Sequence, residues 1–176
     1  AAMLLTVYDN EEDAFYTLVT MMNKYECRQL FKNTFPKLKQ FTFVHEQLMR
    51  KRFAKLQKHL AKLSVNSNMY LPNWILSMFC HSFSSDFATD VFEGFLLHGW
   101  IAFHQIVLQL FACYEKQLLQ CKCLESAMSI IQRDIPKTSF KQLERYEKDV
   151  NNKLESDLNE AERLYKIKRE MRKKKV

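Results

Sequence analysis

The sequence predicts an all-α protein built as a helical bundle, and three observations support this fold class. The chain of 176 residues has 2 glycines and 3 prolines, far below the usual shares of roughly 7% and 5%, so few positions suit the tight turns of β-hairpins. Hydrophobic residues make up 47% of the chain and include 14 phenylalanines, which is enough for a buried core. Apolar positions recur in steps of three and four, the spacing of one face of a helix.

Three helical elements are expected in the first third of the chain. Residues 9–12 (DNEE) have the D-x-x-E form of a capping box, and apolar residues then recur at helical spacing, which predicts a helix over about 11–23. Residues 27–31 predict a short helical turn. Over 39–63 the apolar residues step by threes, fours and one five, with basic residues largely between them. This pattern predicts one long amphipathic helix with a basic outer face, which we expect to be solvated.

The segment from 70 to 110 predicts the centre of the core, since it holds both glycines, both tryptophans and one of the prolines. Pro72 suits the first turn of a helix that continues to residue 79. The Ser84-Ser85 pair offers a hydroxyl N-cap for the next helix. Gly99 ends that helix, because glycine readily takes the left-handed conformation needed there.

Three further elements are expected after this glycine. An apolar helix continues from Trp100 to about residue 119, and a short helix covers 124–132. Pro136 marks the clearest boundary in the second half. Residues 140–175 contain neither Gly nor Pro and carry a narrow apolar stripe, which predicts one long, partly exposed helix.

The five cysteines are an odd number, which indicates free thiols in a reducing, cytoplasmic compartment. We expect Cys80 and Cys113 to be buried, because apolar residues surround them in the sequence. Cys121-x-Cys123 lacks a second pair of ligands at zinc-site spacing, so we expect no metal and no cofactor. No apolar run reaches the roughly 18 residues that a membrane-spanning helix needs.

The formal net charge of +7 favours an acidic partner, such as nucleic acid, an anionic membrane or an acidic protein. No nucleic-acid-binding motif accompanies the basic segments, so we expect no nucleic acid partner. Near an anionic membrane each basic residue contributes about 1 kcal/mol. The predicted contact with such a membrane or with an acidic partner is the basic tail: Arg172, Lys173, Lys174 and Lys175.

The chain opens on the apolar residues AAMLLTVY without an initiator methionine. This start predicts a fragment, in which a helix is cut in two and its N-terminal partner is missing. An unpartnered apolar segment can be buried against a second copy. A dimer through this N-terminal segment is therefore one expectation.

Four stretches of the chain carry the pattern of a known family in the family's own order. Residues 74–79 (WILSMF) match Trp-Phe-Leu-Thr-Leu-Phe, and residues 91–99 (VFEGFLLHG) match an Ile-Trp-Asp core followed by apolar residues, an acidic residue and Gly. Residues 11–15 (EEDAF) and 53–60 (FAKLQKHL) match two stretches that precede them. Together they resemble the C-terminal half of the TBC domain, the helical domain of proteins that activate GTP hydrolysis by Rab GTPases.

The resemblance implies the C-terminal lobe of a TBC domain over 1–136 and a long, charged helical extension over 137–176. It also implies family-signature residues with a structural role: Trp74, Phe79, Phe92, Glu93 and Gly99. We expect the aromatic side chains among them in the core, because they recur at helical spacing in apolar runs. Glu93 has two alternatives, since a buried carboxylate needs a basic partner or a helix to cap, whereas an exposed one needs neither.

TBC proteins supply an Arg finger from an Ile-x-x-Asp-x-x-Arg motif and a Gln finger from a Tyr-x-Gln motif. The Arg neutralises charge on the γ-phosphate, and the Gln orients the attacking water. Neither motif occurs in this sequence, where Lys137 follows Asp134 at the position of the Arg and Gln117 is one residue too far from Tyr114. The resemblance therefore implies a chain without catalytic residues of its own.

The function implied is that of a fragment of a Rab GTPase-activating protein in vesicle traffic, which is not an enzyme alone. Its partner would be a Rab-type GTPase, bound through the intact domain, and its location the cytoplasm or the periphery of endomembranes. The alternative is a catalytically inert helical scaffold that binds protein partners or acidic membranes.

Overall fold

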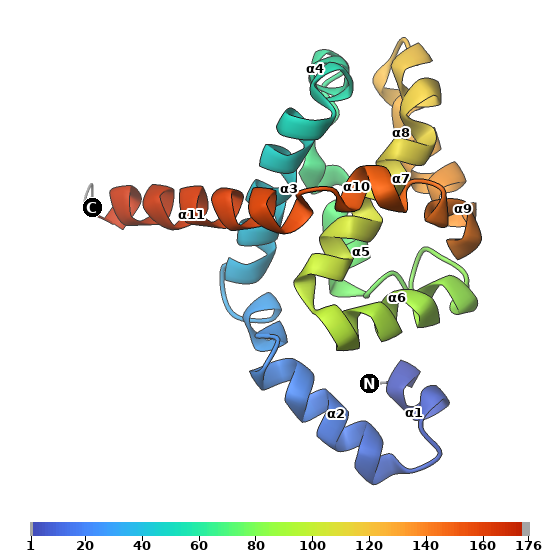
Figure 1. Ribbon diagram of the computed structural model, residues 1–176, viewed down its shortest axis with the longest axis vertical. Helices are drawn as coiled ribbons and strands as arrows, with labels where there is room; N and C mark the ends of the chain where they lie inside the picture. The colour runs from blue at the N-terminus through green and yellow to red at the C-terminus, as the bar shows by residue number, and fades with distance from the viewer. Residues whose placement is uncertain (1, 174–176) are drawn as a thin grey trace.

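The computed structural model describes residues 2–173, apart from the side chains of residues 148, 149, 172 and 173. Every regular element in this part of the chain is helical, which confirms the all-α prediction. The α-helices (Figure 1) are α1 (Ala2–Val7), α2 (Glu11–Asn23), α3 (Pro36–Arg52), α4 (Ala54–Lys62), α5 (Leu71–Leu76), α6 (Ser85–His98), α7 (Trp100–Gln120), α8 (Leu124–Ser129), α9 (Phe140–Glu144), α10 (Glu147–Asn151) and α11 (Leu154–Lys173). Short turns of other helix types are η1 (Cys27–Leu30), η2 (Ser67–Met69), η3 (Ile130–Asp134) and η4 (Ile135–Lys137).

Helix α7 is the centre of the fold. It packs against α4, α6, α9, α10 and α11, and ten of its 21 residues are buried. A helix that is apolar around most of its circumference is stable only when other helices surround it. The segment around residues 70–110 therefore forms the core, as its composition indicated.

Helices α1 and α2 pack against each other at the end of the molecule where α6 lies (Figure 1). Turn η1 follows α2 and packs on α3, which links this pair of helices to the bundle. Helix α2 begins and ends as the apolar spacing predicted. Its N-cap differs from the prediction, because Asn10 rather than Asp9 accepts a hydrogen bond from the backbone N–H of Glu12.

The prediction of one helix over 39–63 is wrong, since α3 and α4 meet at a break. Phe53 at this break has φ −125° and ψ 48°, outside the helical region. The step of five residues from Leu48 to Phe53 gives the physical reason. Five residues of an unbroken helix turn by about 500°, which is not close to a whole number of turns. The apolar residues after Phe53 would therefore point away from the core. The break restores the alignment, and Leu48, Leu56 and Leu60 are all buried.

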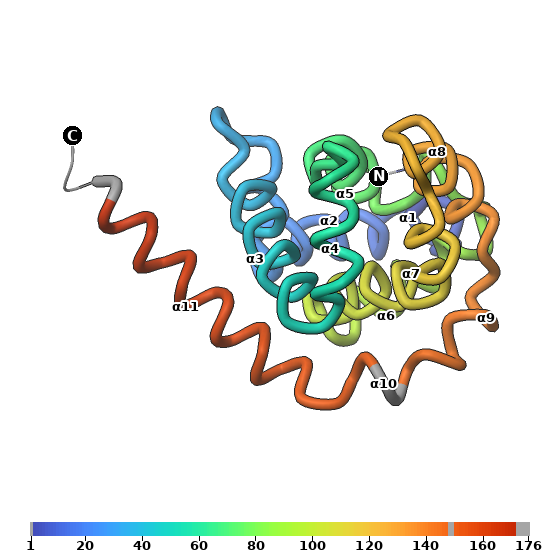
Figure 2. Tube along the Cα trace, turned by 90° about the horizontal axis from the view of Figure 1, so that it is seen from above, coloured from blue at the N-terminus to red at the C-terminus, as the bar shows by residue number. Residues whose placement is uncertain are grey.

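The prediction of one helix over 140–175 is also wrong. Helices α9 and α10 first pack on α7, and α11 then crosses α3 and runs out from the bundle (Figure 2). A straight helix could not follow both surfaces, and Lys153 takes a left-handed φ of 59° just before α11. The predicted apolar stripe is confirmed, because Val150, Leu154, Leu158 and Ala161 are buried.

Cys80 is exposed and Cys113 half-buried, so the expectation that both are buried is wrong. The apolar neighbours of Cys80 face the core, whereas its own position lies in the turn after α5. Cys27 is buried, and burial raises the pKa of its thiol to about 11. Among residues 2–173, no helix is both long and apolar enough to span a bilayer.

Candidate functional site

The signature aromatic residues lie in a cluster between α5, α6 and α7. Trp74 is 2% exposed and Phe79 is 0% exposed. The Trp74 ring centroid lies 5.8 Å from that of Phe79, and the Phe79 centroid lies 4.8 Å from that of Phe103. Aromatic pairs at such separations contribute about 0.5–1.5 kcal/mol each beyond the burial of their surface. These side chains therefore hold the lobe together and are not available to a ligand.

The end of α5 explains how Phe79 reaches the core. Met78 and Phe79 have left-handed φ values of 50° and 65°. The N–H of Phe79 donates to the carbonyl of Trp74 at 2.8 Å, and the N–H of Met78 donates to that of Ile75 at 3.3 Å. This is the Schellman ending of a helix, in which glycine usually takes the first left-handed position. The ring contact between Trp74 and Phe79 is the apolar contact that accompanies such an ending.

Gly99 occupies the junction of α6 and α7 with a φ of 65°. A Cβ atom at this position would lie 3.1 Å from the Tyr25 ring. The Tyr25 hydroxyl donates to the carbonyl of Leu96, and the indole N–H of Trp100 donates to the carbonyl of Tyr25 at 2.7 Å. The absence of a side chain at Gly99 thus lets the segment after α2 close onto α6 and α7.

Phe92 and Glu93 lie next to each other on α6 but face different surroundings. Phe92 is buried and borders an apolar hollow of about 160 Å³ between α1, α2, η1 and α5. Glu93 is exposed and forms no ion pair with any residue that the structure describes. Of its two alternatives, simple exposure is the one observed.

Two histidines are buried in the core, on α3 and α7. His45 on α3 lies with its Nε2 atom 2.9 Å from the Tyr70 hydroxyl, and the ring of His104 on α7 stacks on Phe41 at 3.8 Å. The Nδ1 atoms of both rings have no hydrogen-bond partner. Burial lowers the pKa of His45 to about 3, and burial with the nearby His45 and Lys37 holds the pKa of His104 well below its ordinary value. Both rings are therefore neutral in the folded protein.

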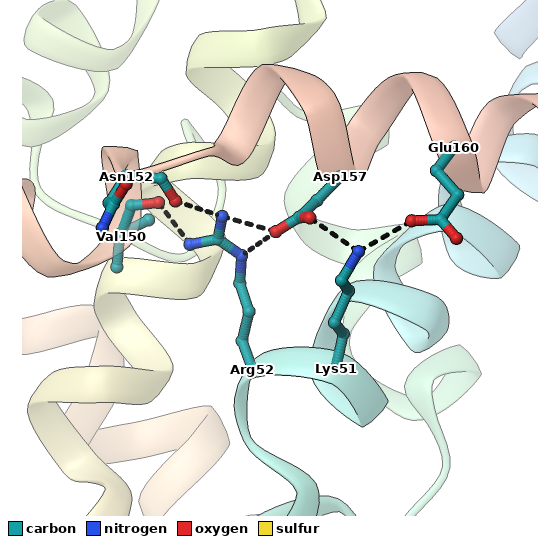
Figure 3. Close-up of polar contacts among 6 residues, drawn as sticks. All are labelled: Lys51, Arg52, Val150, Asn152, Asp157 and Glu160. Carbon is teal, nitrogen blue, oxygen red and sulfur yellow. Dashed lines mark hydrogen bonds and ion pairs between the residues drawn. The ribbon is translucent and has the colours of Figure 1, made fainter.

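A polar cluster fastens α11 to the end of α3 (Figure 3). Arg52 donates two hydrogen bonds to the Asp157 carboxylate, at 2.7 and 2.9 Å, and others to the carbonyls of Val150 and Asn152. Lys51 bridges Asp157 at 2.8 Å and Glu160 at 2.7 Å. Burial acts to raise the pKa of Asp157, but the hydrogen bonds from Lys51 and Arg52 outweigh it and lower the pKa.

This cluster changes the interpretation of the basic face. We expected that face to be solvated, yet Arg52 donates to carbonyls at and just after the end of α10 and to a carboxylate in the first turn of α11. The side chains of Arg52 and Asp157 are only 12% and 10% exposed. A planar guanidinium suits this role because it donates in a fixed fork.

The residues that imitate finger motifs have structural contacts. The Tyr114 hydroxyl donates to the carbonyl of Asp134 at 3.0 Å and accepts from the Thr138 hydroxyl at 3.1 Å. The ammonium of Lys137 lies 3.5 Å from the Asp134 carboxylate on the surface. Gln117 is exposed on α7. The spacing of both pairs still differs from that of the finger motifs.

Helices α1 and α2 carry one of several groups of exposed apolar side chains. Phe15 is 60% exposed and Tyr16 is 59% exposed. The other large ones on these helices are Leu5, Val7 and Val19. Exposed aromatic residues of this kind are typical of protein contact surfaces. The predicted tail contact, Arg172 to Lys175, lies outside the residues whose side chains the structure describes.

Sequence reasoning missed Tyr25, His45 and Arg52. No local pattern distinguishes them, since their partners lie 71, 25 and 105 residues further along the chain. Gly99 was the one indirect sign of Tyr25, because a glycine at a close approach implies a neighbour that needs the space. No group of three metal-binding side chains comes together in the part of the chain that the structure describes.

Comparison with known proteins identifies the family to which this helical architecture belongs. The family model described as the Rab-GTPase-TBC domain matches residues 1–119. The chain is 28% identical over 133 residues to the ecotropic viral integration site 5 protein homolog of Homo sapiens, which covers 76% of this chain and 16% of that protein. It is 25% identical over 186 residues to the Rab GTPase-activating protein eat-17 of Caenorhabditis elegans, over 96% of this chain and 21% of that protein.

The chain is also 26% identical over 181 residues to TBC1 domain family member 2A of Mus musculus, over 93% of this chain and 20% of that protein. It thus spans between 16% and 21% of the length of these three relatives. The family match covers α1 to α7, the helices that surround the signature aromatic cluster. The chain therefore belongs to the Rab-GTPase-TBC domain family.

Proposed function

We propose that this chain supplies the C-terminal lobe of a domain that promotes GTP hydrolysis by a Rab-type GTPase in vesicle traffic. Residues 1–136 form that lobe, and residues 137–176 form a helical extension. The observation that carries the proposal is the family match over residues 1–119. The worm relative, which is named as a Rab GTPase-activating protein, aligns with 96% of the chain and supports the same function.

The role of the lobe is to position chemistry that the chain does not contain. Phosphoryl transfer needs an Arg to neutralise charge on the γ-phosphate and a group to orient the water, and this sequence has neither finger motif. Its own contribution is a rigid aromatic core and a protein contact surface on α1 and α2. The lobe acts in the cytoplasm, where its domain meets the GTPase at the periphery of endomembranes.

A chimeric protein tests this proposal. Residues 1–136 replace the aligned segment of the worm eat-17 protein, and GTP hydrolysis is measured over a panel of Rab GTPases. We expect the chimera to stimulate at least one of them and this chain alone to stimulate none. The unfused mixture of the two parts is the control.

Circular dichroism establishes whether the chimera unfolds cooperatively. A folded chimera that stimulates no Rab GTPase would overturn the proposal. Stimulation by this chain alone would overturn the assignment of the fingers to another part of the domain.

The second candidate function is a scaffold that contacts acidic membranes or partner proteins. It is favoured by the exposed basic end of α11, where Lys166 and Arg169 face solvent. Co-sedimentation with phosphatidylserine vesicles and with neutral vesicles tests it. Binding to the anionic vesicles that disappears when residues 172–176 are removed supports the tail as the membrane contact. Binding that never appears, or that survives the truncation, excludes the tail.

A further inference from the structure

A groove with one acidic wall lies where α6 and α7 meet α9, α10 and α11. Its volume is about 590 Å³. The floor is apolar and includes Ile101, Ile106 and Leu143, while one wall carries three carboxylates. Those carboxylates belong to Glu144, Glu147 and Glu155. We refer to this feature as the acidic groove.

The three carboxylates stand out in a chain with a net charge of +7. None of them forms an ion pair with a residue that the structure describes. Glu144, Glu147 and Glu155 are also exposed, so their negative charge faces whatever enters the groove. Like charges on one wall over an apolar floor favour a ligand that is both basic and apolar.

Gln109 on α7 also lines the groove and is 3% exposed. Its amide adds a polar group to the lining beside the carboxylates.

The end of α11 has the complementary chemistry. Figures 1 and 2 show this helix running out from the bundle. Leu164, Ile167 and Met171 are 45%, 45% and 62% exposed. Their spacing of three and four residues places them on one face of the helix. Exposed basic side chains accompany this apolar stripe: Arg163, Lys166 and Arg169.

A single chain cannot bring these two features together. Glu155, in the first turn of α11, lines the acidic groove, and Ile167 lies about 18 Å further along the same straight helix. Tyr165 and Lys168 also hold this part of α11 against Phe43 on α3, with the Lys168 ammonium 4.6 Å from the ring centroid. The stripe is therefore available only to another molecule.

We propose that the end of α11 from a second copy of this chain docks in the acidic groove, and that the exchange is reciprocal. The stripe of Leu164, Ile167 and Met171 covers the apolar floor, and the neighbouring basic side chains face the three carboxylates. When each chain inserts its α11 end into the groove of the other, the result is a two-fold symmetric dimer in which both grooves and both stripes are occupied. This proposal does not depend on GTPase activation, and an interface of one helix end on each side gives weak, salt-sensitive association.

Sedimentation velocity on the full chain across a dilution series tests the dimer. The triple variant Glu144→Lys, Glu147→Lys, Glu155→Lys reverses the charge of the groove. We expect the dissociation constant to rise at least about tenfold. For the unaltered chain we expect association to weaken between about 0.1 M and about 1 M salt, because the screening length falls from about 10 Å to about 3 Å.

The partner surface is tested in the same way. The triple variant Arg163→Glu, Lys166→Glu, Arg169→Glu should weaken the dimer as strongly as reversal of the groove. Combining both triple changes in one chain restores opposite charges across the interface, so the dimer should return. A merely destabilising effect of either change could not produce this recovery.

A matched control is Glu11→Lys, Glu12→Lys, Asp13→Lys, which makes the same charge change in the first turn of α2, away from the groove. It should leave the dimer intact. A chain that is monomeric at every concentration, or a dimer that survives reversal of the groove, would overturn the proposal. Loss of the dimer in the α2 control would instead place the interface on the N-terminal apolar segment. Open-ended polymers would overturn the reciprocal exchange.

Discussion

Acidification should destabilise this fold well before its carboxylates are protonated, because His45 and His104 are buried as neutral rings. Burial lowers the pKa of His45 to about 3 and holds that of His104 well below its ordinary value. In the unfolded chain both side chains titrate at about 6.5. The unfolded state therefore binds more protons than the folded state at every pH between these values.

The sign and size of the effect follow from this difference. The contribution of the two neutral histidines to the free energy of unfolding is fully present above about pH 7. It falls as the pH drops through the pKa of the unfolded chain, and it goes on falling toward the folded pKa of His45, near 3. From about pH 7 to about pH 5, His45 alone should remove about 2 kcal/mol from the free energy of unfolding. His104 should add a loss of the same sign, because its pKa is also lowered in the folded state. The His45 loss alone is already a sizeable part of the roughly 5–15 kcal/mol that holds a typical domain folded.

Urea unfolding followed by far-UV circular dichroism at both pH values measures this loss. His104→Phe keeps a flat ring stacked on Phe41 and should reduce the pH dependence of the free energy of unfolding, whatever it does to stability at neutral pH. His81→Gln is the control, since His81 is exposed, and should leave the pH dependence unchanged. A total loss below about 1 kcal/mol, or an unchanged slope in His104→Phe, would refute the reasoning.

Three substitutions test the contacts that shape the lobe. Arg52→Met leaves Asp157 largely buried without its guanidinium partner and should lower the free energy of unfolding by about 3 kcal/mol. If urea unfolding shows no loss beyond error, Lys51 alone is enough to stabilise the Asp157 carboxylate. Gly99→Ala places a Cβ 3.1 Å from the Tyr25 ring at a φ of 65° and should lower stability by about 1–2 kcal/mol; an unchanged melting temperature would contradict this. Ser64→Gly relieves a left-handed φ of 62° after α4 and should add about 1 kcal/mol, or roughly 2–4 °C in the melting temperature, and a decrease would count against the strain.

Local signals in the sequence were sufficient for the helices that one face of apolar residues defines. Helix α2 coincides with the predicted range, and α7 ends one residue beyond it. The caps at Ser84 and Gly99 were predictable as well, because each depends on the chemistry of one residue and its immediate neighbours. The signature around Trp74 was also sufficient to identify the family, since its pattern is short and continuous.

The breaks and the site could not be predicted in the same way. The step of five at Phe53 was visible in the sequence, but only the packing of Leu56 and Leu60 on α7 shows that the chain bends there instead of exposing the stripe. The acidic groove is formed by residues of α6, α7, α9, α10 and α11 that meet only after folding. Periodicity describes one helix at a time, so it contains no information about a surface shared by several.

The cluster around Arg52 connects these features. Its guanidinium donates to carbonyls at and just after the end of α10 and holds Asp157 in the first turn of α11, so it fixes the direction in which α11 leaves the bundle. Residues beyond the family match at 119 are thereby tied to α3, which lies within it. If α11 had no fixed orientation, its apolar stripe would have no defined position. The entropy lost on ordering the helix would then weaken docking in a second copy. Arg52→Met should therefore weaken the dimer as well as the fold, even though Arg52 does not line the acidic groove.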